Sequence, residues 1–180
     1  ALSMNFELTE TQQLIQETFR EFCQKRIAPR AREMDETEVF PRDLFSEVGR
    51  LGYLGLALPK VYGGMGLDFV TCSLVAEEAG RVSSGFALSF GAHSFLCAHN
   101  LYCFGNDQQR HKYLPKLASG EWIGAFALTE PGAGSDSTSL ASAATKRGGE
   151  YILNGAKMII TNGSIADIVL VFARTPRKPG

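Results

Sequence analysis

The sequence predicts an α+β fold, in which an N-terminal all-α helical bundle is followed by an antiparallel β domain. Apolar residues recur at helical spacing from Thr9 to Leu117. After Trp122 this pattern gives way to short alternating segments separated by glycine-rich turns. We therefore expect a helical domain over residues 1–122 and a β domain over residues 123–180.

Composition excludes several classes of function. The 180 residues carry a net charge of −1 and are 44% apolar, which suffices for a packed core. A charge near zero gives no electrostatic reason to expect nucleic acid or an anionic membrane. No apolar run approaches the ~20 residues of a membrane span. The cysteines show neither C-x-x-C nor metal-ligand spacing, so we expect no metal and reduced, buried thiols at Cys23, Cys72, Cys97 and Cys103.

The first helix is expected to begin at a capping box. In Thr9-Glu10-Thr11-Gln12 the Thr and Gln side chains can satisfy each other's backbone N–H groups. Apolar residues then continue at helical spacing to Ile27. Pro29 interrupts or restarts the helix, and residues 28–36 are expected to be helical.

A shorter helix and a long connection follow. Pro41 can occupy the first position of the next helix, which should end at Gly52. Residues 54–68 contain Gly63-Gly64-Met65-Gly66, which could cradle a phosphate. A loop that needs unusual backbone angles is the favoured interpretation of these glycines.

Three more helices are expected over residues 69–81, 84–104 and 107–117. The segment 84–104 is apolar on most sides, which is typical of a helix in the middle of a bundle. Alternatively, its small residues could make room for an apolar ligand. Asp107 is expected to cap the last of these helices.

Strands are expected where apolar residues alternate between turn signals, over residues 123–128, 141–146, 150–153, 156–160 and 166–173. Gly148-Gly149 is expected to form one turn, and Asn154-Gly155 is a strong hairpin signal. A sheet of so few strands leaves open edges, which natural domains cover or close. We therefore expect the chain to be truncated.

A candidate ligand loop, residues 127–136, lies where the helical pattern ends. It combines two hydroxyls, Thr129 and Ser135, with Glu130 and the close-approach glycine Gly134. It has neither the Gly-Lys-Ser/Thr ending of a phosphate loop nor the G-x-G-x-x-G spacing of a dinucleotide fold. On chemistry alone a tight surface turn stays open as an alternative.

Four motifs in the same order resemble the acyl-CoA dehydrogenase family: residues 62–67, 112–121, 127–139 and 157–163. The resemblance covers essentially the whole chain. It implies an N-terminal helical domain, a middle β domain that is incomplete here, and a C-terminal four-helix domain that is absent.

The resemblance also implies a reaction, the α,β-dehydrogenation of an acyl-CoA thioester with FAD as cofactor. A carboxylate removes the α-proton and the β-hydrogen leaves as hydride to N5 of FAD, after which electrons pass to an electron-transferring flavoprotein. The family's base lies beyond Gly180, so Glu130 is expected to anchor its loop and the fragment alone to be inactive. The segment 84–104 looks most like short- and branched-chain members, so a short, branched or cyclic acyl group is preferred.

The resemblance further implies a homotetramer, in a bacterial cytoplasm or, in a eukaryote, in the mitochondrial matrix. The residues implied to bind the flavin are Phe126, Leu128, Thr129, Gly134, Ser135, Ile159, Ile160 and Thr161. Those implied to contact the substrate are Ser135, Phe90 and His93. Asp136 is expected to hydrogen-bond backbone groups of its turn.

One position departs from the family pattern. Ile159 stands where an aromatic residue, often Trp, commonly lies over the flavin. An aliphatic side chain can still exclude water but cannot stack in the same way. Two alternatives stay open: an acyl-CoA oxidase or other flavoenzyme on the same scaffold, and a non-catalytic acyl-CoA or flavin binding module.

Overall fold

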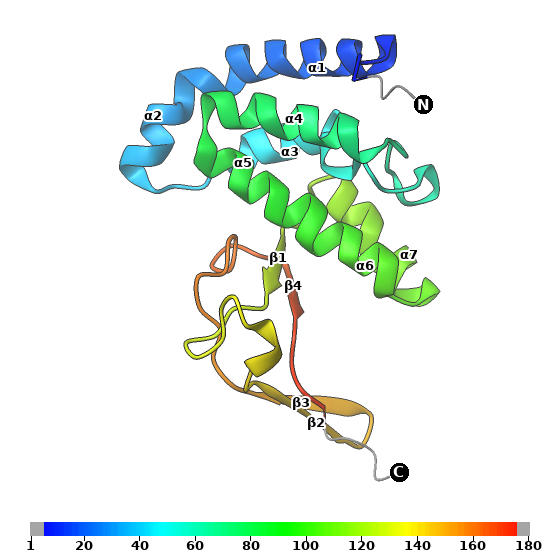
Figure 1. The fold of residues 1–180 in the computed structure, drawn as a ribbon, viewed down its shortest axis with the longest axis vertical. Coiled ribbons are helices and arrows are strands. Elements are labelled where there is room, and N and C mark those ends of the chain that lie inside the picture. The colour runs from blue at the N-terminus through cyan, green and yellow to red at the C-terminus, as the bar shows by residue number, and fades with distance from the viewer. Residues whose placement is uncertain (1–5, 176–180) are drawn as a thin grey trace, which may run out of the picture.

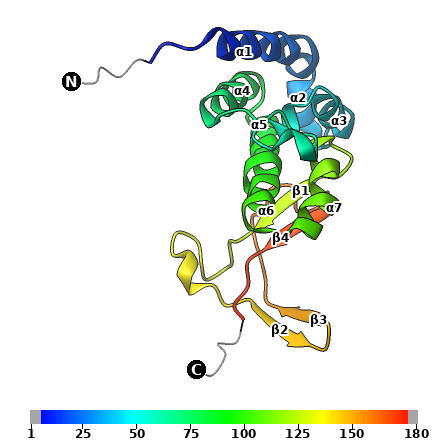
Figure 2. The same cartoon turned by 90° about the vertical axis from the view of Figure 1, so that its right-hand side faces the viewer.

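The computed structural model describes residues 6–175. Helices gather at one end of an elongated molecule, and strands form the other end (Figure 1). Turned by 90°, the same view shows the strand pair nearest the helices lying beneath them, with a second strand pair projecting away (Figure 2). The predicted helical bundle followed by a small β part is therefore confirmed.

The N-terminal helices follow the sequence signals closely. Helix α1 spans Glu10–Phe22, and its capping box forms as predicted: Thr9 Oγ1 accepts from Gln12 N at 3.2 Å, and Gln12 Oε1 accepts from Thr9 N at 2.9 Å. A π-helical turn, Cys23–Ile27, leads into α2, Ala28–Thr37, which carries Pro29 in its first turn. The proline thus restarts the helix.

Helix α3, Arg42–Arg50, begins one residue later than predicted, because Pro41 is its cap and not its first residue. The connection to α4 contains two short 3₁₀ turns, Tyr53–Gly55 and Lys60–Tyr62. Gly63 has φ +82°, and a Cβ at Gly64 would lie 2.0 Å from Leu58 O. Backbone conformation and close packing explain these glycines, as the favoured interpretation required.

Helix α4 spans Phe69–Val82 and is followed by one long helical run through the middle of the bundle. That run comprises α5, Ser84–Gly91, a π-helical segment, Ala92–Ala98, and α6, His99–Phe104. Helix α7, Asp107–Ala118, is capped by Asn106, whose Oδ1 accepts from Gln109 N. The prediction of Asp107 as the cap was wrong by one residue.

The core lies between these helices. Its largest fully buried side chains are mostly aromatic and aliphatic, namely Phe19, Phe45, Phe90, Ile27, Leu44, Leu54, Leu56, Leu58, Leu114, Leu117, Ile123 and His93. The segment 84–104 contributes Phe90 at its centre, with ring centroids 6.4 Å from Phe19 and 5.7 Å from Phe95. Its predicted place inside the bundle is confirmed.

The strands form two separate pairs. Strands β2, Ala143–Arg147, and β3, Glu150–Asn154, pair antiparallel around the predicted Gly148-Gly149 turn. Strands β1, Gly124–Ala127, and β4, Ile168–Val171, pair parallel, with Phe126 opposite Leu170. The expectation of a purely antiparallel β domain was therefore wrong for this second pair.

The strand expected over residues 156–160 is absent, so the Asn154-Gly155 hairpin prediction was also wrong. Gly155 has φ +149°, and a Cβ there would lie 2.3 Å from Ser142 Oγ. Just beyond it, Lys157 Nζ donates to Leu128 O at 2.8 Å. Residues 155–157 therefore run toward the end of β1 and do not pair with β3.

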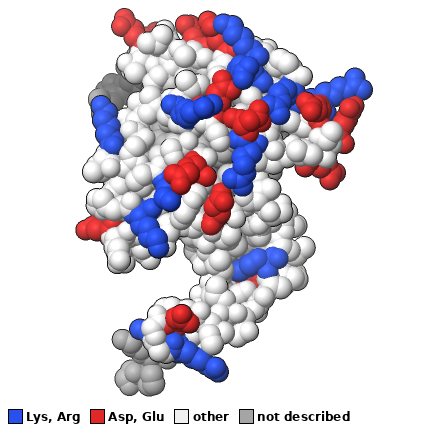
Figure 3. All heavy atoms as spheres, turned by 180° about the vertical axis from the view of Figure 1, so that it is seen from behind, with Lys and Arg blue, Asp and Glu red and all other residues white. Residues whose placement is uncertain are grey.

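On the face drawn in Figure 3, acidic and basic side chains alternate over the helical end rather than gathering by sign. Many are joined in ion pairs, such as Arg26 with Glu47 at 2.9 Å and Arg20 with Glu78 at 2.8 Å. Within residues 6–175, no helix is both long and apolar enough to cross a membrane.

Candidate functional site

The loop that follows β1 is anchored by Glu130, which is buried to all but 6% of its surface. Its carboxylate accepts from Ala141 N at 2.5 Å, from Ser142 N at 3.0 Å and from Lys157 Nζ at 2.8 Å. The Lys157 ammonium, followed by Ser142 and the Ala141 amide, lowers the pKa of Glu130 to about 2. A carboxylate so fully occupied and so weakly basic is an anchor, as expected, and not a proton acceptor.

Lys157 joins two stretches of chain that lie far apart in the sequence. Besides the Glu130 carboxylate, its ammonium contacts Leu128 O at 2.8 Å. One residue further on, Met158 N donates to Thr129 O at 3.1 Å. The structure thus places Leu128 and Thr129 beside Lys157 and Met158, at the start of the segment 157–161.

These two stretches contain five of the eight residues predicted to bind the cofactor. Leu128, Thr129, Ile160 and Thr161 are half-buried. Ile159 is 82% exposed and has φ +54°, which is rare for a β-branched residue. Together these residues offer apolar side chains and two hydroxyl groups, and Ile159 is the most exposed of them.

The remaining predicted cofactor residues lie on either side of Leu128 and Thr129 in the sequence. Phe126 is half-buried on β1, with its ring centroid 5.0 Å from that of Phe172. Gly134 and Ser135 are exposed further along the loop. No heavy atom lies within 4 Å of a Cβ built at Gly132 or Gly134, so the space beside this turn is open.

Asp136 shapes the turn after Ser135. It accepts from Thr138 N at 3.1 Å, from Thr138 Oγ1 at 2.5 Å and from the Ser139 hydroxyl. These hydroxyls, Ser139 first, hold the pKa of Asp136 below its usual range. The expectation that Asp136 hydrogen-bonds its own turn is thus met.

Phe90 and His93, the residues predicted to contact the substrate, have packing roles within the described chain. Both have no exposed surface. His93 Nε2 lies 3.0 Å from Leu117 O, and His93 Nδ1 accepts from Gly124 N at 2.9 Å. Both ring nitrogens are therefore used inside the chain, and burial lowers the pKa of His93 to about 4. The histidine is a neutral bridge between the helices and β1.

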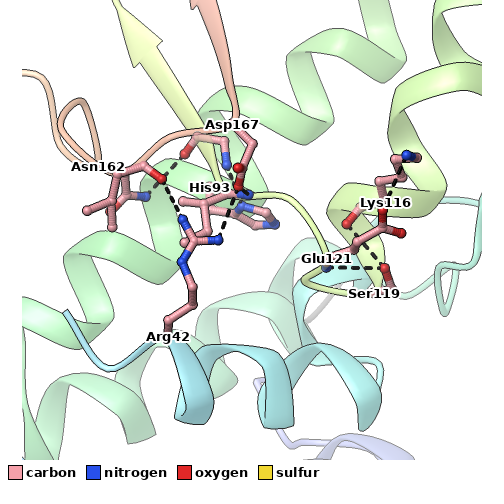
Figure 4. A network of polar contacts seen from close by, with 10 residues as sticks. Arg42, His93, Lys116, Ser119, Glu121, Asn162 and Asp167 are labelled. Atoms are coloured by element: carbon pink, nitrogen blue, oxygen red, sulfur yellow. Dashed lines mark hydrogen bonds and ion pairs between the residues drawn. The ribbon is translucent and has the colours of Figure 1, made fainter.

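Two residues near the site were missed in the sequence. Lys157 is described above. Asn162 is buried, and its Nδ2 donates to Ser89 O at 3.0 Å and to Gly124 O at 3.1 Å. In Figure 4, Asn162, His93 and Asp167 converge on the start of β1. The structural role of Asn162 depends on its positive φ and on distant partners. The pattern of the sequence shows neither.

A further contact holds the end of the same loop. Asp167 Oδ2 accepts from Ile123 N at 2.8 Å, and Arg42 of α3 reaches Asp167 at 3.3 Å and Ile165 O at 2.9 Å. The loop from residue 157 to 167 is therefore tied to the β1 end, to α5 and to α3.

The thiols are partly as expected. Cys23, Cys72 and Cys97 are buried, and burial raises the pKa of Cys23 to about 12 and of the other two to about 11. Cys103 is exposed, so the expectation of burial was wrong there, because it lies on the outer side of α6. Over the described chain, no group of three or more His, Cys, Asp or Glu residues could hold a metal ion.

Two family models match this chain. The model described as acyl-CoA dehydrogenase, N-terminal domain, covers residues 9–121, and the model described as acyl-CoA dehydrogenase, middle domain, covers residues 125–180. Isovaleryl-CoA dehydrogenase of Bos taurus is 47% identical over 170 residues, which are 93% of this chain and 40% of that protein. The chain thus spans less than half the length of the curated relatives it matches.

Solved structures agree. The butyryl-CoA dehydrogenase of Megasphaera elsdenii superposes with a TM-score of 0.88 at 38% identity, over 94% of this chain and 45% of that chain. An acyl-CoA dehydrogenase of Bacillus anthracis complexed with FAD gives a TM-score of 0.89 at 37% identity, over 96% of this chain and 31% of that chain.

Proposed function

Since the chain belongs to the acyl-CoA dehydrogenase family, we propose that the whole protein catalyses the FAD-dependent α,β-dehydrogenation of an acyl-CoA thioester. The observation that supports this proposal is the tie made by Lys157 and Met158, which joins Leu128 and Thr129 to the start of the segment 157–161. These are the two stretches that the family resemblance assigns to the flavin.

The residues present fit a flavin. Ile159 and Met158 offer exposed apolar surface that a planar ring would cover. The open space beside Gly132 and Gly134 would admit a pyrophosphate close to the backbone. The negative charge of Glu130 in the same loop is already paired with Lys157.

Each residue then has a defined task. Thr129 and Thr161 orient the cofactor through their hydroxyl groups, and Leu128 through its backbone. Phe126, Ile159 and Ile160 support the ring and exclude water. Gly134 and Ser135 approach the pyrophosphate, and Ser135 also contacts the CoA portion. When bound, FAD supplies the acceptor for the hydride that leaves Cβ.

The base lies in the part of the protein that follows residue 180. Glu130 cannot serve, because the pKa of its carboxyl is about 2 and its oxygens are occupied. Residues 1–180 alone should therefore show no turnover. The names of similar proteins favour a short or branched acyl group as substrate. Electron-transferring flavoprotein is the proposed acceptor, and a homotetramer is the proposed assembly.

The test is the visible spectrum of the full-length protein, before and after anaerobic addition of isovaleryl-CoA, butyryl-CoA and glutaryl-CoA. We expect an oxidised flavin spectrum that bleaches with a short acyl-CoA, and the relative rates rank the substrates. A flavin that stays oxidised with every acyl-CoA would sink the dehydrogenase proposal in favour of another flavoenzyme. A reduced flavin that reoxidises rapidly in air would point to an oxidase.

A further inference from the structure

Asn162 follows directly after Thr161, and only 8% of its surface is exposed. Its side-chain amide donates two hydrogen bonds, one to Ser89 O in α5 and one to Gly124 O at the first residue of β1. Its backbone has φ +64°, a conformation that Asn tolerates better than most residues. One side chain therefore ties a loop to both the helical and the β part of the chain.

Gly124 is held from two sides. Its N–H donates to His93 Nδ1 at 2.9 Å, and its C=O accepts from Asn162 Nδ2 at 3.1 Å. Strand β1 runs from Gly124 straight into Leu128 and Thr129. Gly124 is thus connected to both stretches. Strand β1 links it to Thr129, and the side chain of Asn162 links it to the residue that follows Thr161.

The segment between Lys157 and Asn162 is fixed at both ends. At one end Lys157 Nζ holds Leu128 O at 2.8 Å, and at the other Asn162 Nδ2 holds Gly124 O. Ile159, Ile160 and Thr161 lie between these ties. A short stretch held at both ends keeps its side chains in one arrangement, whereas release of one end lets them shift by the ångström or so that matters for positioning.

We propose that Asn162 is a positioning residue, which sets the place of the Thr161 hydroxyl relative to Thr129. This inference rests on the proposed function, because it concerns the two hydroxyls that orient the flavin. Asn162 itself touches neither cofactor nor substrate in this account and acts through its neighbour.

The chemistry of the amide supports a role beyond stability. Asn162 Oδ1 is buried and has no hydrogen-bond partner among residues 6–175. A buried polar atom without a partner opposes folding, so an amide is a poor choice for packing alone. What the amide supplies is a pair of donors aimed at two carbonyl oxygens in different elements.

The same loop offers a matched control. Arg42 ties the loop at Ile165 O and Asp167, beyond Asn162 and away from Thr161. Arg42→Met therefore loosens the attachment of the loop to the helices without releasing the segment 157–162. An effect seen in both the Arg42 and the Asn162 variants would reflect lost stability. An effect seen only in the Asn162 variants would reflect lost positioning.

The experiment uses the full-length holoenzyme with two substitutions. Asn162→Gly keeps the freedom to adopt a positive φ but removes both donors, and Asn162→Asp keeps the size but turns acceptors toward the two carbonyl oxygens. We expect the limiting rate of anaerobic flavin reduction by isovaleryl-CoA or butyryl-CoA to fall about 10- to 100-fold, with KM changed less than about threefold. Arg42→Met should lower Tm yet keep that rate within about twofold.

A second readout needs no turnover. In the apoprotein, backbone amides of residues 157–163 should exchange with deuterium about tenfold faster in Asn162→Gly than in the unaltered protein, because the loop opens locally more often. The visible spectrum of bound flavin should also shift in both Asn162 variants and not in Arg42→Met.

Several outcomes would overturn the inference. One is a rate of flavin reduction in Asn162→Gly equal to that of the parent protein. This result would leave the proposed function intact. Another is an equal loss of rate in Arg42→Met at equal loss of Tm, and a third is failure of both Asn162 variants to fold while Arg42→Met folds. If no acyl-CoA bleaches the unaltered protein, the proposed function fails instead, and unchanged exchange at residues 157–163 would separately remove the positioning role.

Discussion

The ammonium of Lys157 lies 2.8 Å from the Glu130 carboxylate and 2.8 Å from Leu128 O. Both side chains are largely shielded, with 13% and 5% of their surfaces exposed. This ion pair therefore helps to hold together the two stretches proposed to bind the flavin, beside the backbone bond from Met158 N to Thr129 O. Its loss should affect cofactor binding as well as stability, because the loop that Glu130 anchors is the loop proposed to face the cofactor.

Lys157→Met should weaken FAD binding by the full-length protein about tenfold and lower Tm. Removing the ammonium leaves the Glu130 carboxylate buried without a counter-charge, which is unfavourable for a charged group. Flavin content after gel filtration and differential scanning calorimetry are the measurements.

Lys146→Met is the matched control, because Lys146 is an exposed lysine on β2 of the neighbouring hairpin. It should leave flavin content and Tm close to those of the parent protein. Equal losses in both variants would contradict the role given to Lys157.

The Glu130 carboxyl predicts acid sensitivity with a definite sign. Its pKa is about 2 in the folded chain against an ordinary value of 4.5, so below pH 4.5 the unfolded chain takes up a proton that the folded chain does not. The stability it contributes is complete above pH 4.5 and is lost as the pH falls toward 2. Urea denaturation at pH 7, 4.5 and 3 should show a smaller fall for Glu130→Gln than for the parent protein, from a lower starting stability. Parallel curves would contradict this.

His93 predicts a second, separate pH window. The pKa of this buried ring is about 4, against an ordinary 6.5, so the unfolded chain binds the proton first. Stability is complete above pH 6.5 and falls by roughly 3 kcal/mol as the pH drops to 4. His93→Gln should be less stable at pH 7 and show a shallower slope between pH 6.5 and 4. An unchanged slope would mean that another group titrates in this window.

Replacing Ile159 by a residue that tolerates a left-handed backbone should stabilise the protein, although it removes an apolar side chain. With φ +54° and 82% of its surface exposed, Ile159 bears the cost of a left-handed conformation and has little burial to lose. Ile159→Asn should stabilise the apoprotein by about 1 kcal/mol, because Asn tolerates this conformation. The same change should weaken flavin binding, since it removes apolar surface from the side chain proposed to support the ring.

Val169→Asn is the control for this prediction. Val169 is also β-branched and partly exposed, at 41%, but it lies in β4, where the backbone is extended. There the substitution should destabilise, because Asn is disfavoured in strands. Stabilisation at both positions would point to a solubility effect and not to backbone strain.

The helical part could be predicted well because its signals are local. The capping box at Thr9 and the restart at Pro29 act within a single turn, and both appear as expected. The apolar segment 84–104 was expected in the middle of the bundle, and its buried residues lie there. The errors, Pro41 and Asp107, are shifts of one residue at helix starts.

The β part could be predicted only where a turn stands next to its strands. The Gly148-Gly149 turn lies inside one hairpin and formed as expected. Asn154-Gly155 carries an equally good local signal, but the tertiary contact of Gly155 with Ser142 prevails over it. The parallel pairing of β1 with β4 has no short-range signal in the sequence.

For the site, the sequence could identify the two stretches but not what holds them together. Thr129 and Thr161 belong to recognisable motifs, and the structure places their stretches side by side through Met158. Lys157 and Asn162 act through backbone carbonyl oxygens of residues about 30 to 70 positions away, and no spacing rule predicts such partners. For Phe90 and His93, which the family resemblance assigns to the substrate, the sequence could not separate packing from ligand contact, because a helix that packs inside a bundle and one that lines a cavity share the same pattern.

The parallel pairing of β1 with β4 sets an order of events during synthesis. Ile123, just before β1, and Asp167, just before β4, are 44 residues apart in the sequence. Strand β1 therefore leaves the ribosome well before its partner strand β4. At about 5–20 residues per second, β1 waits several seconds with an unpaired edge beside an already formed helical part. During that interval its apolar edge is open to wrong partners, including a second nascent chain. Translation speed between residues 128 and 167 should therefore influence the yield of folded protein more than translation speed across the helices.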